Sequence, residues 1–302
     1  MSSTFCAFCN EKRNYVYHLN GYAIYRCACC GLIGVGEPPT EKYLYEYYQG
    51  FSFQADLGKL SCVLIPEIRN WMRSFLPSIP ATMLDFGGGS GFFAKAFEHF
   101  GFGESTYFDL DGSACRFASN ELGVKRVLHG SVDDLLALNK DAAFDFIYCR
   151  HVIEHLTDPV KLIFKLAELL SHQGVLVIQC PNGRSKEGIA YPGYWRQFLA
   201  KVARDNQWTK PYAIAFSLTK GYGWGLSPPR HLWSITGQSI IRMFLRDQRF
   251  TCVIKTASLA NAVYSPYFQS NTRLGKLRNF TCNMIFGPVL PGMHLIAEIR
   301  RR

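Results

Sequence analysis

Two cysteine pairs near the start of the chain have the residue types and spacing of a metal site. Cys6 and Cys9 form one C-x2-C pair, and Cys27 and Cys30 form another. Each pair can place two thiolates on one tight turn, and two facing pairs supply the four tetrahedral ligands of a structural zinc ion. The alternatives are that Cys29 replaces Cys30, or that the cysteines are separate core residues. We predict a zinc site that holds structure, because four protein ligands leave no open position for catalysis.

A glycine-rich stretch, MLDFGGGSG, follows an apolar run and precedes a helical pattern. A strand, a glycine turn and a helix N-terminus together present backbone amides to a ligand. The spacing is D-x-G-x-G-x-G, so Asp85 stands at the head of the turn, where a carboxylate would repel a pyrophosphate. It suits a ligand with an ammonium group, such as S-adenosylmethionine (SAM). We predict that Asp85 orders the turn and the amino end of SAM, while Gly87 and Gly89 allow close approach of the backbone. Asp109, about 20 residues further on, would bind the ribose hydroxyls.

Histidines supply the candidate catalytic groups. Methyl transfer is an in-line displacement, and a hydroxyl acceptor must also lose a proton. The segment CRHVIEHL provides His151 and His155 one helical turn apart, and His231 lies in PPRHLW. In one interpretation His151 or His231 is the general base. In another, His155 packs at a helix start and catalysis relies on positioning alone.

The elements expected to position these residues alternate between strands and helices. ATMLD and STYFDLD are typical of buried strands, and SGFFAKAFEHFG between them is typical of an amphipathic helix. A hairpin with its turn at Asn20-Gly21 can bring the cysteine pairs together. RFTCVIKTAS and MHLIAEIRR are expected to be the last strands, one of them antiparallel. The predicted fold class is α/β, a doubly wound sheet with a small N-terminal zinc ribbon and a helical lid.

Residues 81–182 resemble the class I SAM-dependent methyltransferases, in the group that also contains the ubiquinone-pathway O-methyltransferases. MLDFGGGSG resembles the first motif of this family and YFDLDGSA the second. The segment from FDFIYCRHVIEHL to LVIQCPN resembles the fourth strand, its helix and the fifth strand, and PPRHLWSITGQSIIRMF resembles the late helix. The cysteine pairs resemble a zinc ribbon fused to some bacterial members, commonly in sugar or natural-product pathways.

The resemblance implies a larger set of cofactor contacts. GSVDDLL occupies the segment that flanks the adenine. The family often has an acid where this chain has Ser131, so Asp133 is a candidate to serve instead. The implied SAM-binding residues are Asp85, Phe86, Gly87, Gly88, Gly89, Gly91, Asp109, Leu110, Ser131, Val132, Asp133 and Arg150.

A second resemblance adds a third interpretation of the histidines. Metal-dependent small-RNA methyltransferases, and some quinone-pathway relatives, use a similar E-x-x-E-H element. It would make Glu154, His155 and His231 ligands of a divalent metal. This chain has His151 where the first glutamate of that element stands, which counts against the metal.

Positive charge is concentrated in the C-terminal part of a chain whose formal net charge is +10. Residues 1–183 carry 15 Lys or Arg against 19 Asp or Glu, whereas residues 184–302 carry 18 against 4. This indicates either a solvated basic surface or an anionic partner. We expect a small anionic acceptor rather than nucleic acid, since no cluster of Lys and Arg is interleaved with aromatic residues. Residues 273–292 are basic and then apolar, which predicts a pocket lid, with weak contact to a membrane surface as the alternative.

Five segments are predicted: a zinc ribbon (1–38), a helical linker (39–80), a SAM-binding core (81–183), a basic helical lid and acceptor region (184–248), and C-terminal strands with an insertion (249–302). The predicted function is transfer of a methyl group from SAM to an oxygen of a small anionic intermediate. The alternatives are an RNA methyltransferase and an inactive SAM-binding module. The sequence has no run of about 18 apolar residues and no basic-then-apolar leader, so we expect a cytoplasmic protein with reduced cysteines.

Overall fold

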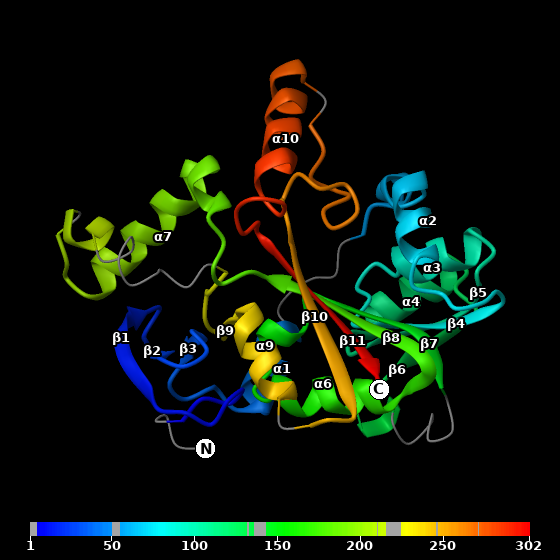
Figure 1. The fold of residues 1–302 in the computed structure, drawn as a ribbon, viewed down its shortest axis with the longest axis horizontal. Helices are drawn as coiled ribbons and strands as arrows, with labels where there is room; N and C mark the ends of the chain where they lie inside the picture. The colour runs from blue at the N-terminus through cyan, green and yellow to red at the C-terminus, as the bar shows by residue number, and fades with distance from the viewer. Residues whose placement is uncertain are drawn as a thin grey trace.

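A computed structural model describes residues 5–49, 55–131, 133–135, 143–209, 211–215, 225–245, 247–270 and 272–302 of the 302-residue chain. Its main feature is a central sheet of seven strands (Figure 1). In chain order these strands are β4 (Ala81–Phe86), β5 (Gly103–Asp109), β6 (Arg126–His129), β7 (Phe144–Arg150), β8 (Leu170–Pro181), β10 (Phe250–Ala257) and β11 (His294–Arg301).

The strand order is β10-β11-β8-β7-β4-β5-β6. Five neighbouring strands, β8 to β6, are parallel, whereas β11 pairs antiparallel with both β8 and β10. The order reverses at β4, so a crevice forms beyond the carboxyl ends of the strands on either side of it. This confirms the predicted doubly wound sheet of the class I methyltransferase type, with an antiparallel strand among the last two.

Helices cover both faces of the sheet because neighbouring strand residues point to opposite sides. On β4, Met83 packs in a core with α2 (Pro66–Arg73) and α3 (Phe92–His99). Leu84, the next residue, packs in a second core with α6 (Pro159–Glu168) and α9 (Gly237–Phe244). The helix α4 (Gly112–Asn120) joins the first of these layers through Cys115 and Ala118.

The N-terminal cysteines belong to a separate four-stranded antiparallel sheet. Its strands are β1 (Arg13–Leu19), β2 (Tyr22–Cys27), β3 (Ile33–Val35) and β9 (Trp233–Ser234), in that order. The β1–β2 turn has positive φ at both Asn20 (52°) and Gly21 (82°), which confirms the predicted hairpin. The fourth strand comes from residues about 200 positions further along the chain. A Cβ at Gly34 would lie 2.3 Å from the Trp233 ring, so glycine is what allows β3 and β9 to meet.

Additional contacts join this sheet to the rest of the molecule. Its side chains share one hydrophobic core with Ile147 and Leu166 of the central domain. The Thr236 hydroxyl, at the N-cap of α9, donates to the Cys30 carbonyl at 2.7 Å. The ribbon is therefore packed into the molecule rather than attached by a linker alone.

The remaining helical elements lie around the carboxyl edge of the sheet and the ribbon. The helix α7 contacts β1, and Asn206, directly after this helix, exchanges hydrogen bonds with the His18 backbone. The helix α10 stands out from the body at the top of Figure 1. None of the described helices is both long enough and apolar enough to cross a bilayer. The bounds of these elements are α1 (Glu41–Gln49), η1 (Leu57–Cys62), η2 (Ile153–His155), η3 (Glu187–Ala190), α7 (Pro192–Asp205) and α10 (Arg273–Ile285).

Candidate cofactor and acceptor site

The glycine turn between β4 and α3 has a backbone that only glycine adopts without strain. Gly87, Gly89 and Gly91 have φ values of 64°, 54° and 70°. A Cβ on Gly87 would lie 2.5 Å from the Val152 side chain, so this residue is also required by packing. A Cβ on Gly89 would meet no atom within 4 Å. The space in front of Gly89 is therefore open, as a site for close approach of a ligand requires.

The two acids predicted to serve SAM both hold this turn. Asp85 is buried and accepts a hydrogen bond from the Ala94 amide of α3 at 3.1 Å, and burial raises its pKa to about 7. Asp109 accepts from the Gly89 and Asp111 amides, both at 2.9 Å. Burial also raises the pKa of Asp109. The structure thus places Asp109 directly behind the glycine turn, at the carboxyl end of β5.

The other residues predicted to bind SAM lie in several different environments. Leu110 follows Asp109 at the end of β5 and is 49% exposed. Ser131 caps a short turn through its bonds with Asp134. The Asp133 carboxylate forms an ion pair with Lys165 of α6. Val132 lies outside the described residues. Phe86 is the last residue of β4, and Gly88 lies in the turn, where an added Cβ would lie 2.7 Å from the Asp85 carboxylate.

Arg150, at the end of β7, is held between aromatic rings. Its guanidinium carbon lies 5.7 Å from the Phe93 ring centre and 5.8 Å from that of Tyr267. The Tyr264 carbonyl accepts from Arg150 at 3.4 Å and from Gln179 at 2.8 Å. The two tyrosines lie in a loop after β10 without regular spacing, so no sequence pattern marks them as site residues. They form a wall of the site on the side of β8 and β11.

A buried glutamate and a histidine form the first part of the candidate catalytic centre. The short helix η2 follows β7 and places Glu154 with no side-chain exposure above the sheet edge. His151 Nδ1 lies 3.1 Å from Glu154 Oε1. His151 has a φ of 54°, and its amide donates to the Gln179 carbonyl at 2.8 Å, so β8 fixes this strained backbone. Burial, and then the positive charge of Arg150, lower the pKa of His151 well below its usual value.

The other two histidines complete the cluster. The rings of His155 and His231 are 4.6 Å apart between centres, although the residues are 76 positions apart in the chain. Nδ1 of His155 lies 2.8 Å from the Arg230 carbonyl, and Nδ1 of His231 lies 2.6 Å from the Gly225 carbonyl. A carbonyl can only accept, so each Nδ1 carries the proton and each Nε2 keeps its lone pair. Burial lowers the pKa of both rings, that of His155 to about 4.

The structure therefore brings together all three histidines that the sequence singled out. One ligand atom each from Glu154, His155 and His231 lies within 4.8 Å of the other two. Glu154 Oε2 is buried and has no hydrogen-bond partner among the described residues. The Tyr48 hydroxyl, from α1, also lies 2.7 Å from His155 Nδ1. This centre is close to the cofactor residues, because Val152 of the same segment contacts the glycine turn.

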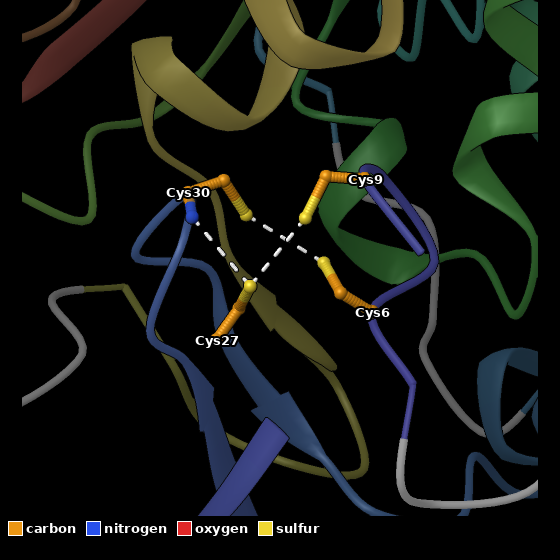
Figure 2. Close-up of side chains that lie close together, drawn as sticks. All are labelled: Cys6, Cys9, Cys27 and Cys30. Carbon is orange, nitrogen blue, oxygen red and sulfur yellow. Dashed lines mark hydrogen bonds between the residues drawn. The ribbon is translucent and has the colours of Figure 1, made fainter. Parts of the chain in front are cut away.

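The four predicted zinc ligands form a second buried cluster (Figure 2). The sulfurs of Cys6 and Cys30 are 3.6 Å apart, and those of Cys9 and Cys27 are 3.5 Å apart. All four lie within 4.8 Å of one another, and Cys29 is not part of the set. Burial is the main cause that raises the pKa of Cys9 to about 12, and the nearby Cys27 and Cys6 thiols act in the same direction. A cation between the sulfurs would favour their ionised forms.

Arg13 supplies a positive charge beside this cluster. It is 7% exposed, and its guanidinium donates to the carbonyls of Val35 and Gly36 at 3.0 and 3.2 Å. Burial lowers the pKa of Arg13, and thiolates at Cys6 and Cys27 would oppose this effect by favouring its charged form. A zinc ion with four thiolates carries a net charge of −2, so a buried cation nearby fits such a centre.

The fold and the glycine turn together define a class I methyltransferase. A family model described as a methyltransferase domain matches residues 66–253, and the chain belongs to this family. It is a SAM-dependent methyltransferase. No curated protein sequence matches the chain.

Solved structures of methyltransferases are similar to the chain at low identity. The plantazolicin methyltransferase BamL, in complex with a triazolic desmethylPZN analog and SAH, is 15% identical, with a TM-score of 0.47 over 87% of this chain and 91% of that one. A SAM-dependent methyltransferase from Archaeoglobus fulgidus is 16% identical, with a TM-score of 0.46 over 87% and 100%. A putative methyltransferase from Bacillus halodurans C-125 is 15% identical, with a TM-score of 0.42 over 77% and 96%.

Proposed function

We propose that the protein transfers the methyl group of SAM to an oxygen of a small anionic acceptor, with His151 as the general base. The contact between His151 Nδ1 and Glu154 Oε1 is the observation on which this proposal rests. A carboxylate that accepts from Nδ1 fixes the tautomer and leaves Nε2 able to take a proton from a hydroxyl. SAM, when bound, supplies the activated methyl group. Asp109 and the glycine turn would hold its ribose and methionine parts.

Positive charge around the centre supports an anionic acceptor. Arg150 and Arg230 are both close enough to lower the pKa of His151 through their charge. Their field would attract a carboxylate or phosphate and favour loss of a proton from a hydroxyl beside it. The acceptor class is tested with a hydroxylated aromatic carboxylate, its amide and its amino analogue, each incubated with methyl-labelled SAM. Equal transfer to the carboxylate and its amide would contradict the proposal that the acceptor is anionic. Preferred transfer to the amino analogue would contradict the proposal that oxygen is methylated.

We expect His151→Ala to lower kcat by roughly 10²- to 10⁴-fold, the usual range for loss of a general base. The affinity for SAM should stay within about twofold of the wild type, because the proposed contacts to its ribose and methionine parts come from Asp109 and the glycine turn and not from the His151 side chain. Calorimetric titration of SAM and initial rates of label transfer measure the two quantities separately. His172→Ala is the matched control, since this histidine is exposed near the start of β8, at the edge of the sheet opposite the site. An unchanged kcat in His151→Ala would exclude His151 as the base.

In the second candidate mechanism, Glu154, His155 and His231 bind a divalent metal that activates the acceptor. The unpartnered Glu154 Oε2 and the two Nε2 lone pairs are a donor set that fits zinc or another first-row metal. The backbone carbonyls that hold each Nδ1 resemble the outer contacts that orient metal-bound histidines. A bound cation would polarise the acceptor oxygen.

Metal content distinguishes the two candidates. If the second centre binds zinc, elemental analysis of the purified protein should give about two zinc ions per chain. His231→Ala should then lower the content to about one, with the cysteine cluster still loaded. A content of one ion per chain in both proteins, after dialysis against zinc, would leave His151 as a base without a metal.

We further propose that Cys6, Cys9, Cys27 and Cys30 hold a structural zinc ion. The geometry of the four sulfurs and the buried Arg13 support it. A sheet of this size buries little apolar surface of its own. The bound ion would supply the stabilisation that this small core cannot.

A further inference from the structure

The helix α10 has the reverse of the polarity expected on the surface of a soluble protein. A surface helix normally buries its apolar side chains and exposes its polar ones. In α10 the buried side chains are those of Asn279 and Cys282, and the neighbouring Asn283 donates to the Ala260 carbonyl at 3.2 Å. The apolar side chains point outward: Leu274, Leu277, Phe280 and Met284 are 78%, 61%, 66% and 61% exposed.

These side chains form one continuous surface. They follow one another at intervals of three or four residues, which places them along one side of the helix. Val289, in the turn directly after α10, extends the apolar surface and is 75% exposed. We call Leu274, Leu277, Phe280, Met284 and Val289 the α10 surface. A shallow groove of about 390 Å³ runs beside it, with Ile285 and Phe286 in its wall.

Basic residues border the α10 surface, and no acid lies near it in the sequence. Arg273, Lys276 and Arg278 are exposed on the same helix. At about 100° per residue, Lys276 and Arg278 fall on opposite flanks of the apolar row. The chain has no Asp or Glu between residues 258 and 297. An apolar row flanked by cations is the pattern of a helix that lies in the interface of a membrane.

We propose that α10 docks on the surface of a bilayer that contains anionic phospholipids. Leu274, Leu277 and Phe280 would enter the boundary between headgroups and acyl chains, while Arg273 and Lys276 contact phosphates. A second copy of the chain fits less well. A twofold contact through α10 would bring identical cations together with no acid from the same segment to compensate them.

The docked helix lies on the side of the molecule that holds the site. β10 runs parallel to β8, because each pairs antiparallel with β11, so Ala257 ends at the same sheet edge as Arg150. The loop between β10 and α10 carries Tyr264 and Tyr267, which contact Arg150. The helix that docks is therefore joined directly to the loop that contacts the site residue Arg150.

Flotation with lipid vesicles tests this inference on the full-length protein. We expect it to float with vesicles of phosphatidylcholine and phosphatidylglycerol at low salt, and much less with phosphatidylcholine alone. Leu277→Asp combined with Phe280→Asp should lower the bound fraction at least about tenfold. Leu245→Asp is the matched control, because Leu245 is also an exposed leucine (63%) at a helix end, but on α9. The variants must bind SAM as the wild type does, which shows that they are folded.

Further tests address the role of charge and the alternative of a dimer formed through α10. Lys276→Glu should weaken binding to the anionic vesicles, and higher salt should weaken binding of the wild type. Failure of the wild type to float with anionic vesicles at low salt would overturn the proposal. So would a dimer, detected by sedimentation velocity, that the double variant dissociates, because α10 would then face a second copy.

Discussion

Gly89→Ala is expected to weaken SAM binding by roughly 10- to 100-fold, which corresponds to about 1.4–2.8 kcal/mol. The added methyl group meets no protein atom within 4 Å, so it fills the space into which the cofactor would fit. The positive φ of 54° adds a backbone strain of about 1 kcal/mol to the folded protein. Strain alone lowers stability, whereas occupied space lowers affinity, and calorimetric titration of SAM measures the second effect directly.

Gly101→Ala separates these two effects. Gly101 has a similar φ of 70° and also has no atom within 4 Å of an added Cβ, but it lies before β5, at the edge of the sheet opposite the site. Both variants should lose a similar amount of thermal stability, and only Gly89→Ala should lose affinity for SAM. Equal SAM affinity in both variants would mean that the cofactor does not approach the Gly89 backbone.

Cys9→Ser is expected to cost one zinc ion per chain and to unfold the N-terminal sheet. Structural zinc in small peptides contributes roughly 10–16 kcal/mol to the folded form, and much of this depends on four thiolates. The Cys9 sulfur is one of the four that face one another and lies 3.5 Å from that of Cys27 (Figure 2). Elemental analysis gives the zinc content, and limited proteolysis reports opening of β1 and β2.

Cys29→Ser is the matched control for this loss. It makes the same chemical change next to Cys30, at a partly exposed thiol that lies outside the four-sulfur cluster. We expect full zinc content and wild-type resistance to protease. A Cys9→Ser protein that retains its zinc would contradict the ribbon, and zinc loss in Cys29→Ser would mean that the wrong thiol was assigned.

Features that are local in sequence were predictable. The glycine turn, its acid and the strand that follows lie within about 25 residues, so their spacing predicted a cofactor-binding element, and the resemblance of these motifs to the class I methyltransferases implied the fold class. The Asn20-Gly21 turn was equally local, since both residues tolerate the positive φ that the hairpin needs. The C-x2-C spacing also predicted which four thiols meet, and the structure places Cys30 rather than Cys29 among them.

Features that depend on distant residues could not be predicted from spacing. The resemblance to metal-dependent methyltransferases grouped His231 with Glu154 and His155, but nothing near His231 in the sequence places its ring 4.6 Å from that of His155, because backbone carbonyls and β9 fix its position. Tyr264 and Tyr267 reach Arg150 through a loop whose path follows from the pairing of β10 with β11. The outward direction of Leu277 and Phe280 could not be read from the sequence either, since the pattern shows an apolar row but not which way it faces.

The pairing of β3 with β9 has a consequence for synthesis of the chain. All four thiols are available once Cys30 has left the ribosome, so the ion can bind before the rest of the domain is made. The partner of β3 is made about 200 residues later, which at 5–20 residues per second is roughly 10–40 s. Through this interval the β3 edge, with the hydrophobic side chains of Ile33 and Val35, has no strand beside it and can pair with a wrong one. The N-terminal sheet is thus completed only when β9 has been made. His231 lies two residues before β9, so this histidine reaches the site in the same step that completes the sheet.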